Sequence, residues 1–323
     1  MPIKIIRYKN KATDYVGWAI FEGGIYSIDC ECESTHSFLN TGLPVAHKMI
    51  NDLSVYEKNL ISESDIDILS PITAPCRILC QGSNYPQSRI ETGMDPNDKS
   101  FNTLFHKSDA SISSPNAEII SPSHVRLLDY EVELGIVIGT DIHKETTVTK
   151  DNIHKFVAGI VLAHDVTARD IQIPQGQYFK GKSYRTFCPL GPYLCILKKD
   201  EFNYIDNLEL KLFVNGELRQ ADNSKNLIYS PFETITELSQ VTNLTAGDLL
   251  LTGSPGGGAL KVPSGAIVKM LGLLPDKLKW KMFINKQEGN GKYLKHGDEV
   301  ISSISSADGY IDLGTQRNRV RFD

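Results

Sequence analysis

The chain has 323 residues, of which 41% are hydrophobic and 23% charged, a composition typical of a globular protein. The formal net charge of −5 and the pI near 5.9 exclude the basic footprint of a nucleic-acid-binding protein. Residues 1–10 contain no signal-peptide-like apolar segment, and no apolar run reaches transmembrane length. We therefore expect a cytoplasmic protein with reduced cysteines and without a membrane or nucleic-acid partner.

The N-terminal segment carries short strand and helix patterns. Residues 3–8 and 15–29 have the composition of strands, and Gly23-Gly24 is placed to turn a hairpin within the second segment. Residues 43–60 show apolar side chains at helical spacing. This unit contains no group of residues with recognisable chemistry, so we expect a structural or assembly role.

The proline-containing segment 70–75 marks a domain boundary. We expect a small N-terminal α/β domain at 1–72 and a larger domain at 73–323. Strand patterns dominate the larger domain and βαβ alternation is absent, which predicts a β-rich α+β fold rather than a doubly wound sheet. The expected strands lie at 117–120, 127–139, 156–163, 190–197, 207–214, 247–252 and 298–304.

Turn and cap residues predict where several of these elements join. Asn215-Gly216 and Asp308-Gly309 each favour a tight hairpin between two strands. The segment 230–233, Ser-Pro-Phe-Glu, predicts the start of a helix, with serine as the N-cap and glutamate completing a capping box. The spacing of Thr167 and Asp170 predicts a second capping box and a short helical turn.

The acidic strand at 127–139 is the strongest chemical signal of the sequence. Side chains alternate along a strand, so Asp129, Glu131 and Glu133 are expected on one face, opposite apolar residues. Buried carboxylates are costly unless something neutralises them, which favours a bound divalent cation. An edge strand whose acidic face contacts water is the alternative.

An apolar strand pattern ends at Ala163 and is followed by a dense polar cluster, residues 164–172. Asp165 could supply a third oxygen ligand to a cation held by Glu131 and Glu133. A set made only of carboxylates suits Mg²⁺, Mn²⁺ or Ca²⁺ rather than zinc. The alternative is that Asp165 acts only as a helix cap.

Two further segments favour anion binding less specifically. Lys180 and Lys182 flank a glycine and could face an anionic substrate or a developing enolate, although a solvated surface turn has the same pattern. The glycine-rich segment 247–258 follows a strand, and its backbone N–H groups could form an anion nest. It lacks the Lys-Ser/Thr end of a phosphate-binding P-loop, and by itself it indicates only a permissive turn.

Taken together, these segments resemble the fumarylacetoacetate hydrolase family, specifically its two-domain bacterial-type members. The likeness spans about residues 76–316 in consistent order, and residues 1–70 are similar to the family's variable N-terminal domain. The matching motifs are Asp-Tyr-Glu-Val-Glu at 129–133, His-Asp-Val-Thr-Ala-Arg-Asp-Ile-Gln at 164–172, Lys-Gly-Lys-Ser at 180–183, Thr-Phe-Cys-Pro-Leu-Gly-Pro at 186–192, Leu-Thr-Gly-Ser-Pro at 251–255 and Leu-Lys-His-Gly-Asp at 294–298.

The resemblance implies a large mixed β-roll with a divalent cation at its mouth, assembled as a homodimer. It implies the metal ligands Glu131, Glu133 and Asp165, with Mg²⁺ as the expected ion and Mn²⁺ or Ca²⁺ as alternatives. The remaining residues that it brings to the site are Lys182 as the site lysine, Arg169 and Gln172 as supporting polar groups, and Ser254 where the family has a threonine.

The lid motif departs from the family pattern. The family has Gly-x-Asn-Tyr-x-x-His-x-x-Glu, and residues 82–91 match it through Tyr85 and Glu91, but Ser88 replaces the histidine. In family hydrolases the histidine and glutamate together activate the attacking water. A carboxylate alone has a low pKa for deprotonating water, so the substitution weakens the expectation of ordinary hydrolysis. His106 and His164 are possible replacement bases, and each could equally serve only a structural role.

The expected function is metal-dependent cleavage of a C–C bond in a small anionic 2-oxo or β-diketo acid, of the fumarylacetoacetate or acylpyruvate type. Decarboxylation, isomerisation, dehydration and catalytically silent binding of an oxo acid remain alternatives on the same site. The expected catalytic residues are Glu91, Lys182, Gln172 and His164, and the expected substrate-binding residues are Tyr85, Arg89, Lys107, Arg169 and Ser254. The insertion at 259–293 is expected to shape the pocket or a dimer contact.

Overall fold

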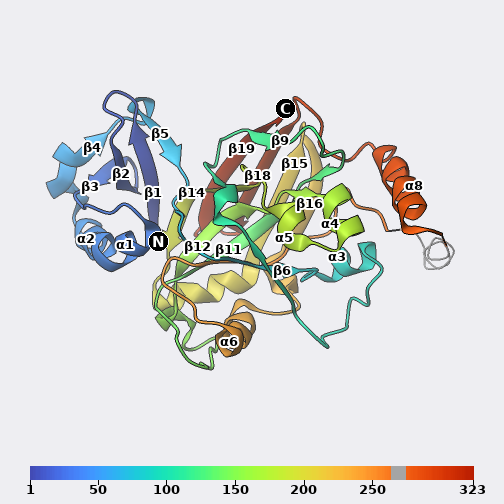
Figure 1. The fold of residues 1–323 in the computed structure, drawn as a ribbon. Coiled ribbons are helices and arrows are strands. Elements are labelled where there is room, and N and C mark those ends of the chain that lie inside the picture. The colour runs from blue at the N-terminus through green and yellow to red at the C-terminus, as the bar shows by residue number, and fades with distance from the viewer. Residues whose placement is uncertain (263–273) are drawn as a thin grey trace.

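The computed structural model describes residues 1–262 and 274–323. Figure 1 shows a small N-terminal lobe beside a larger, strand-rich body. The α+β, β-rich class predicted from the sequence is confirmed. The N-terminal lobe consists of β1 (Ile3–Asn10), β2 (Val16–Phe21), β3 (Ile25–Ile28), β4 (Leu60–Ile61), β5 (Ile66–Leu69), α1 (Thr35–Ser37) and α2 (Leu43–Met49), with a π-helical turn at Phe38–Gly42 and 3₁₀ turns at Leu53–Asn59 and Glu63–Asp65.

One large mixed sheet runs through both parts of the molecule in the order β4-β3-β2-β1-β14-β12-β11-β17-β6-β7, with β5 beside β1 and β8 beside β14. Antiparallel pairing of β1 with β14 places Ile5 opposite Leu194, so backbone hydrogen bonds join the lobe to the body. The division at residues 72/73 stays a prediction. The body's strands in this sheet are β6 (Ile78–Gly82), β7 (Thr103–Lys107), β8 (Ile112–Ser113), β11 (Val132–Ile138), β12 (Val157–His164), β14 (Cys188–Ile196) and β17 (Leu249–Leu251).

A second sheet packs against the first, with the strand order β16-β15-β18-β19-β9. Gln316 of β19 is fully buried and donates hydrogen bonds to the carbonyls of Leu162 (3.0 Å) and Gly191 (2.8 Å) in the first sheet. The main apolar core draws residues from both sheets. The strands of the second sheet are β9 (Ile119–Ser121), β15 (Leu208–Val214), β16 (Glu217–Asn223), β18 (Glu299–Ser306) and β19 (Asp312–Phe322).

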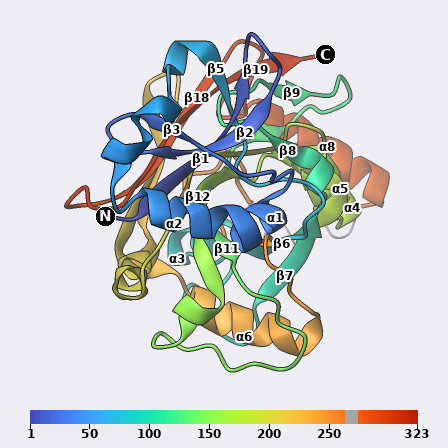
Figure 2. The same ribbon diagram turned by 90° about the vertical axis from the view of Figure 1, so that its left-hand side faces the viewer.

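Helices surround the sheets, and Figure 2 shows α6 at one end of the molecule and the C-terminus at the other. The helices of the body are α3 (Pro86–Glu91), α4 (Arg169–Gln175), α5 (Tyr178–Lys182), α6 (Pro231–Val241) and α8 (Asp276–Glu288), and short strands β10 (Leu128–Asp129) and β13 (Thr167–Ala168) pair beside them. Turns of 3₁₀ helix lie at Asp109–Ser111, Ile153–Lys155, Lys199–Asn207 and Ser224–Asn226. Across the described residues, none of the helices has the length and apolar character needed to span a membrane.

The turn and cap predictions are confirmed at three places. Asn215 and Gly216 both have positive φ, 50° and 80°, and connect β15 to β16. Asp308-Gly309 lies in the turn between β18 and β19. Ser230 caps α6, and its hydroxyl and the Glu233 carboxylate form the expected capping box. These signals succeed because each depends only on neighbouring residues.

Three local predictions were wrong. The strand at 127–139 is interrupted between β10 and β11, so Glu131 lies in the link between two strands. Thr167 does not cap a helix, because its hydroxyl donates to the Asp165 carbonyl (2.8 Å) and accepts from Lys182 (2.9 Å). The single helix at 43–60 ends at Met49, since Asp52 adopts a non-helical backbone conformation. Within the predicted insertion, residues 263–273 lie outside the described residues.

Candidate active site

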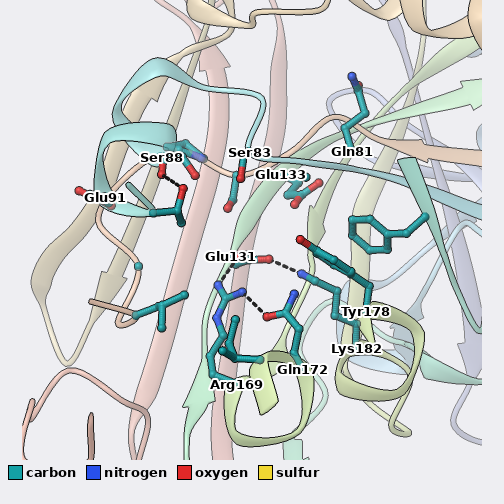
Figure 3. A pocket seen from close by; sticks show the side chains of 18 residues that line it. Gln81, Ser83, Ser88, Glu91, Glu131, Glu133, Arg169, Gln172, Tyr178 and Lys182 are labelled. Carbon is teal, nitrogen blue, oxygen red and sulfur yellow. Dashed lines mark hydrogen bonds and ion pairs between the residues drawn. The ribbon is translucent and has the colours of Figure 1, made fainter. Parts of the chain in front are cut away.

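The three acidic residues predicted as metal ligands come together at the ends of β11 and β12. Figure 3 shows two of them, Glu131 and Glu133, in the pocket. Strand pairing sets Glu133 opposite Ala163, and the Asp165 N–H donates to the Glu131 carbonyl at 2.9 Å, which brings the following side chains to one place. All three residues are buried, and one carboxylate oxygen from each lies within 4.8 Å of the others. Sequence positions 34 residues apart therefore form one acidic cluster.

Two buried lysines hold this cluster. Lys182, at the end of α5, donates to Glu131 Oε2 and Asp165 Oδ2, each at 2.5 Å. Lys107, from β7, donates to Asp165 Oδ1 (2.6 Å) and to the Phe187 carbonyl (2.6 Å). Burial lowers the pKa of Lys182, but the Asp165 and Glu131 carboxylates outweigh burial and raise it above its ordinary value. Lys182 is therefore a fixed positive charge in the site.

The three carboxylates differ in how their charge is balanced. Burial opposes ionisation of Glu131, but Arg169 and Lys182 outweigh it and lower its pKa to about 2. Glu133 has a hydrogen bond from the Gly253 N–H at 2.8 Å and no ion pair among the described residues. Burial, with the charges of Asp165 and Glu131, raises the pKa of Glu133 well above its ordinary value. Lys182 acts on Glu133 only through its more distant charge, and no cationic side chain of the described residues pairs with this carboxylate directly.

A divalent cation fits these donors. Oxygen-only ligands suit hard cations such as Mg²⁺, Mn²⁺ and Ca²⁺, and a cation beside Glu133 would relieve the repulsion among the three carboxylates. Over residues 1–262 and 274–323, this triad is the one cluster of histidine, cysteine or acidic side chains with ligand spacing. The buried triad could therefore bind a divalent metal ion.

Arg169 and Gln172 form the floor of the pocket beside the triad (Figure 3). The Arg169 guanidinium donates to Glu131 Oε1 and to Gln172 Oε1, the latter at 2.8 Å. Both residues lie on α4, whose first turns form the second half of the polar cluster at 164–172. The sequence prediction of two polar supports beside the triad stays a prediction of role, but the structure does bring these residues together with Lys182.

The lid segment forms the opposite wall. Pro86 at the first turn starts the short helix α3, and Ser88 and Glu91 from this helix line the pocket. Ser254 and Gly258 of the glycine-rich segment line it as well. The pocket between these walls has a volume of ≈ 100 Å³, which is suited to a small acid.

Five predicted site residues do not line the pocket: the triad member Asp165, and Tyr85, Arg89, Lys107 and His164. Tyr85 is fully buried, and Arg89 donates to the backbone carbonyls of Ser83 (2.9 Å) and Asp98, which shapes the lid from behind. Lys107 contacts the site through Asp165, as described above. His164 lies 2.6 Å from the Ser302 hydroxyl in the core, and burial, with the charge of Lys107, lowers its pKa to about 3. It is therefore a neutral core residue.

The sequence analysis missed several pocket residues, among them Gln81, Phe105 and Tyr178. Gln81 directly precedes the lid motif, and its amide donates to Thr234 Oγ1 at 2.9 Å. The Phe105 and Tyr178 rings pack together with centroids 4.7 Å apart, and Lys182 lies over the Phe105 ring. Only Gln81 had a usable signal, its position beside the lid, because the two aromatic residues have no distinctive motif.

Comparison with known proteins places this pocket in a family. Residues 77–321 match the family model described as "Fumarylacetoacetate (FAA) hydrolase C-terminal". The chain belongs to this family. The resemblance inferred from the six motifs is confirmed, and the acidic triad lies inside the matched region.

Two curated relatives are named as tautomerases, although the family model is named after a hydrolase. A rat protein named "Oxaloacetate tautomerase Fahd2a, mitochondrial" is 37% identical over 203 residues, which are 61% of this chain and 61% of the relative. "Oxaloacetate tautomerase YisK" of Bacillus subtilis is 36% identical over 200 residues, 61% of this chain and 65% of the relative. The matched region thus spans less than two thirds of these relatives.

The cytoplasmic location and the homodimer stay predictions.

Solved structures of the fumarylacetoacetate hydrolase family resemble the whole chain. The fumarylacetoacetate hydrolase of Exiguobacterium antarcticum superimposes with a TM-score of 0.74 at 27% identity, covering 99% of this chain and 100% of that one. A structure named 5-carboxymethyl-2-hydroxymuconate delta-isomerase, from Mycobacterium smegmatis, gives 0.69 at 23% identity over 99% and 100%, a likeness of fold alone. Proteins named as a hydrolase and as an isomerase thus share this fold, and the sequence relatives are named as tautomerases.

Proposed function

We propose that this protein catalyses the divalent-metal-dependent keto–enol tautomerisation of a small 2-oxo dicarboxylate of the oxaloacetate type. The observation that carries the proposal is the lid: Glu91 lines the pocket with Ser88, and among the described residues the pocket wall contains no histidine. A lone carboxylate is a weak base toward water but a suitable base toward an acidic C–H bond.

The charged floor of the pocket supports an anionic substrate. Arg169 and Lys182 are buried cations beside the triad, and Gln172 and Ser254 add neutral hydrogen-bonding groups. The small volume of ≈ 100 Å³ favours a short acid over a bulky one. A bound Mg²⁺ or Mn²⁺, held by Glu131, Glu133 and Asp165, would polarise the 2-oxo group and acidify the neighbouring C–H bond.

The chain's own residues account for the proton transfer. Glu91 accepts the proton from the carbon next to the 2-oxo group, and the C–H bonding electrons form the C=C bond of the enol. Negative charge then develops on the former carbonyl oxygen, where the fixed ammonium of Lys182 stabilises it. Transfer of the proton from Glu91 to this oxygen completes the enol and restores the Glu91 carboxylate, and the reverse sequence returns the keto form. No water has to be activated.

The names of the relatives support the same substrate class, since two relatives above 35% identity are called oxaloacetate tautomerases. Hydrolysis of an acylpyruvate, the function expected from the sequence, is the second candidate. It is favoured by the likeness over 99% of the chain to the hydrolase of Exiguobacterium antarcticum. The absence of the lid imidazole disfavours it.

A product analysis separates these candidates. Purified protein with Mg²⁺ is mixed in turn with the enol form of oxaloacetate and with acetylpyruvate, and the decay of each is followed by ultraviolet absorbance and chromatography. The proposal expects faster ketonisation than in a protein-free control with the same Mg²⁺, and no more pyruvate from either compound than that control gives. Release of pyruvate and acetate from acetylpyruvate would favour hydrolysis, and release of pyruvate and CO₂ from oxaloacetate would favour decarboxylation. Metal-dependent binding without turnover would favour the oxo-acid-binding alternative.

A further inference from the structure

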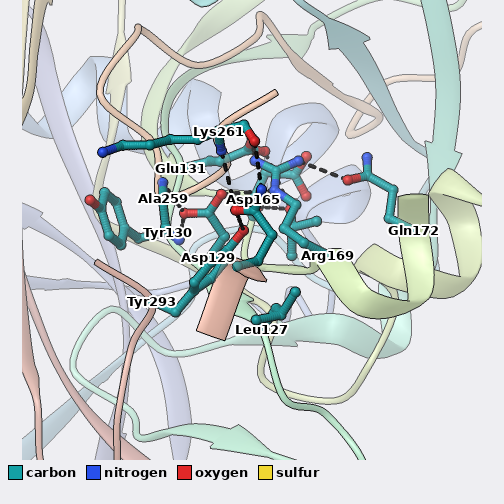
Figure 4. A network of polar contacts seen from close by, with 12 residues as sticks. Leu127, Asp129, Tyr130, Glu131, Asp165, Arg169, Gln172, Ala259, Lys261 and Tyr293 are labelled. Atoms are coloured by element: carbon teal, nitrogen blue, oxygen red, sulfur yellow. Dashed lines mark hydrogen bonds and ion pairs between the residues drawn. The ribbon is translucent and has the colours of Figure 1, made fainter. Parts of the chain in front are cut away.

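A fourth buried carboxylate, Asp129, lies beside the triad but does not itself line the pocket (Figure 4). Its side chain is 0% exposed. The strand pattern places it on the face of Glu131 and Glu133, but it belongs to β10 and its carboxylate turns toward Arg169. A fully buried carboxylate requires hydrogen-bond partners, and both oxygens of Asp129 have them.

Each oxygen of Asp129 holds a different part of the site. Oδ2 accepts from Arg169 Nε at 2.8 Å, and the same guanidinium donates to Glu131 and to Gln172. Oδ1 accepts from the backbone N–H of Ala259 at 2.8 Å, at the end of the glycine-rich segment that lines the pocket. One side chain therefore connects the guanidinium that contacts a triad residue to the loop that closes the pocket.

The loop is held from its other side as well. The Asn290 amide donates to the Ala259 carbonyl, and the Gln287 amide of α8 donates to the Lys261 carbonyl at 2.5 Å. Tyr130 donates its hydroxyl proton to the Gly257 carbonyl at 3.1 Å. The peptide of Ala259 is thus fixed between Asp129 and the segment around α8, so the loop position and the Arg169 orientation depend on the same carboxylate.

We infer that Asp129 is a positioning residue that orients Glu131 for metal binding through Arg169 while fixing the glycine-rich loop through Ala259. The inference rests on the metal site of the proposed function. Groups that hydrogen-bond to a metal ligand from behind set its orientation, and their removal typically weakens metal affinity about 10–100-fold. In Asp129→Asn the side chain keeps its size, but the negative charge that attracts Arg169 is lost.

Asp170 provides a matched control. It is also a buried carboxylate, adjacent to Arg169 in sequence, and it accepts two backbone N–H groups, from Arg126 (2.9 Å) and Leu127 (3.3 Å). It has no hydrogen bond or ion pair with Arg169 or with the triad. Asp170→Asn therefore reproduces the general cost of altering a buried carboxylate without altering the link to Glu131.

The test is the Mn²⁺ dissociation constant of the full-length protein, measured by calorimetric titration without substrate, together with Tm. We expect Mn²⁺ affinity to fall about 10–100-fold in Asp129→Asn and to stay near the wild-type value in Asp170→Asn. Equal affinities in Asp129→Asn and wild type would overturn the inference alone. Failure of the wild-type protein to bind Mn²⁺ would overturn the metal site and the inference together.

A double-mutant cycle keeps the test decisive if Asp129→Asn is poorly folded. Arg169→Lys keeps the charge but loses the planar fork that reaches Asp129 and Glu131 together. If Asp129 acts through Arg169, adding Asp129→Asn to Arg169→Lys weakens Mn²⁺ binding by less than it does alone. Additive losses in the double variant would contradict a path through Arg169.

Discussion

Glu91 accepts a hydrogen bond from the backbone N–H of Gly257 at 2.8 Å, so the lid helix and the glycine-rich loop are joined at the pocket. Gln87, one turn earlier on α3, donates to the other oxygen of Glu91 at 3.1 Å. Within residues 1–262 and 274–323, the carboxylate proposed as the proton acceptor is therefore held in place by neutral donors, without an imidazole or a cationic side chain.

Glu91→Gln tests the proton transfer. Loss of a positioned acid–base group costs on the order of 10²–10⁴-fold in rate, so we expect kcat for oxaloacetate tautomerisation to fall in this range. Glu91 lies on the lid and not in the triad, so the Mn²⁺ dissociation constant should not change. Stopped-flow absorbance gives kcat and calorimetric titration gives the affinity. A kcat near the wild-type value would assign the proton transfer to another group.

Ser88→His tests why hydrolysis is disfavoured. Residues 88 and 91 are three positions apart on α3 and both line the pocket, so an imidazole at position 88 can reach the Glu91 carboxylate. We expect this variant to gain acetylpyruvate hydrolysis that the wild-type protein lacks. Ser88→Asn, which adds a polar side chain without a base, is the control and should gain none. Equal hydrolysis by wild type and Ser88→His would mean that the imidazole is irrelevant.

Lys182→Met tests the charge balance of the triad. Removing one partner of a buried ion pair costs about 3–5 kcal/mol of folding free energy, because the remaining carboxylates are left uncompensated. We therefore expect a lower Tm without added metal. Saturating Mn²⁺ should raise Tm by more in this variant than in wild type, since the cation replaces a missing positive charge. Thermal unfolding with and without Mn²⁺ measures both values, and equal metal-induced shifts would speak against this electrostatic account.

The buried thiol of Cys195, away from the site, should make the folding stability depend on pH. Burial raises the pKa of its thiol from 9.0 to about 12. The unfolded chain releases this proton above pH 9 while the folded chain keeps it, so the stabilising contribution is complete below pH 9 and is lost as pH rises toward 12. The loss approaches about 1.4 kcal/mol per pH unit. Tm measured from pH 8 to 11 should fall less steeply in Cys195→Ala, and parallel curves would rule out this thiol as a contributor.

The sequence predictions that the structure confirms depend mostly on residues close together in the chain. The capping box at Ser230, the hairpin at Asn215-Gly216 and the position of most strands depend on residues close in sequence. The acidic residues Glu131 and Glu133 were recognised from the same kind of local alternation. The position of Asp165 at a strand end leaves a third ligand and a helix cap both open, and the family resemblance favours the ligand.

The unpredicted parts depend on distant contacts. Nothing near Lys107 in the sequence reveals that its ammonium reaches Asp165, 58 positions away. Thr167 has the spacing of a helix cap, yet a tertiary contact with Lys182 occupies its hydroxyl. Asp129 has the alternation of a ligand, but the strand break before Glu131 sends its carboxylate to Arg169. Local propensity cannot specify such pairings.

The most direct test of the account is the Mg²⁺ dependence of enol-oxaloacetate ketonisation by wild type and Glu133→Gln, with the spontaneous rate subtracted. Glu133 is the triad carboxylate without an ion pair, so its neutral analogue removes charge from the cation site while leaving the Lys182 contacts intact. We predict that wild type loses its activity with chelator and regains it with Mg²⁺, and that Glu133→Gln needs far more Mg²⁺. Tautomerisation by chelated wild-type protein at the full rate would contradict the account.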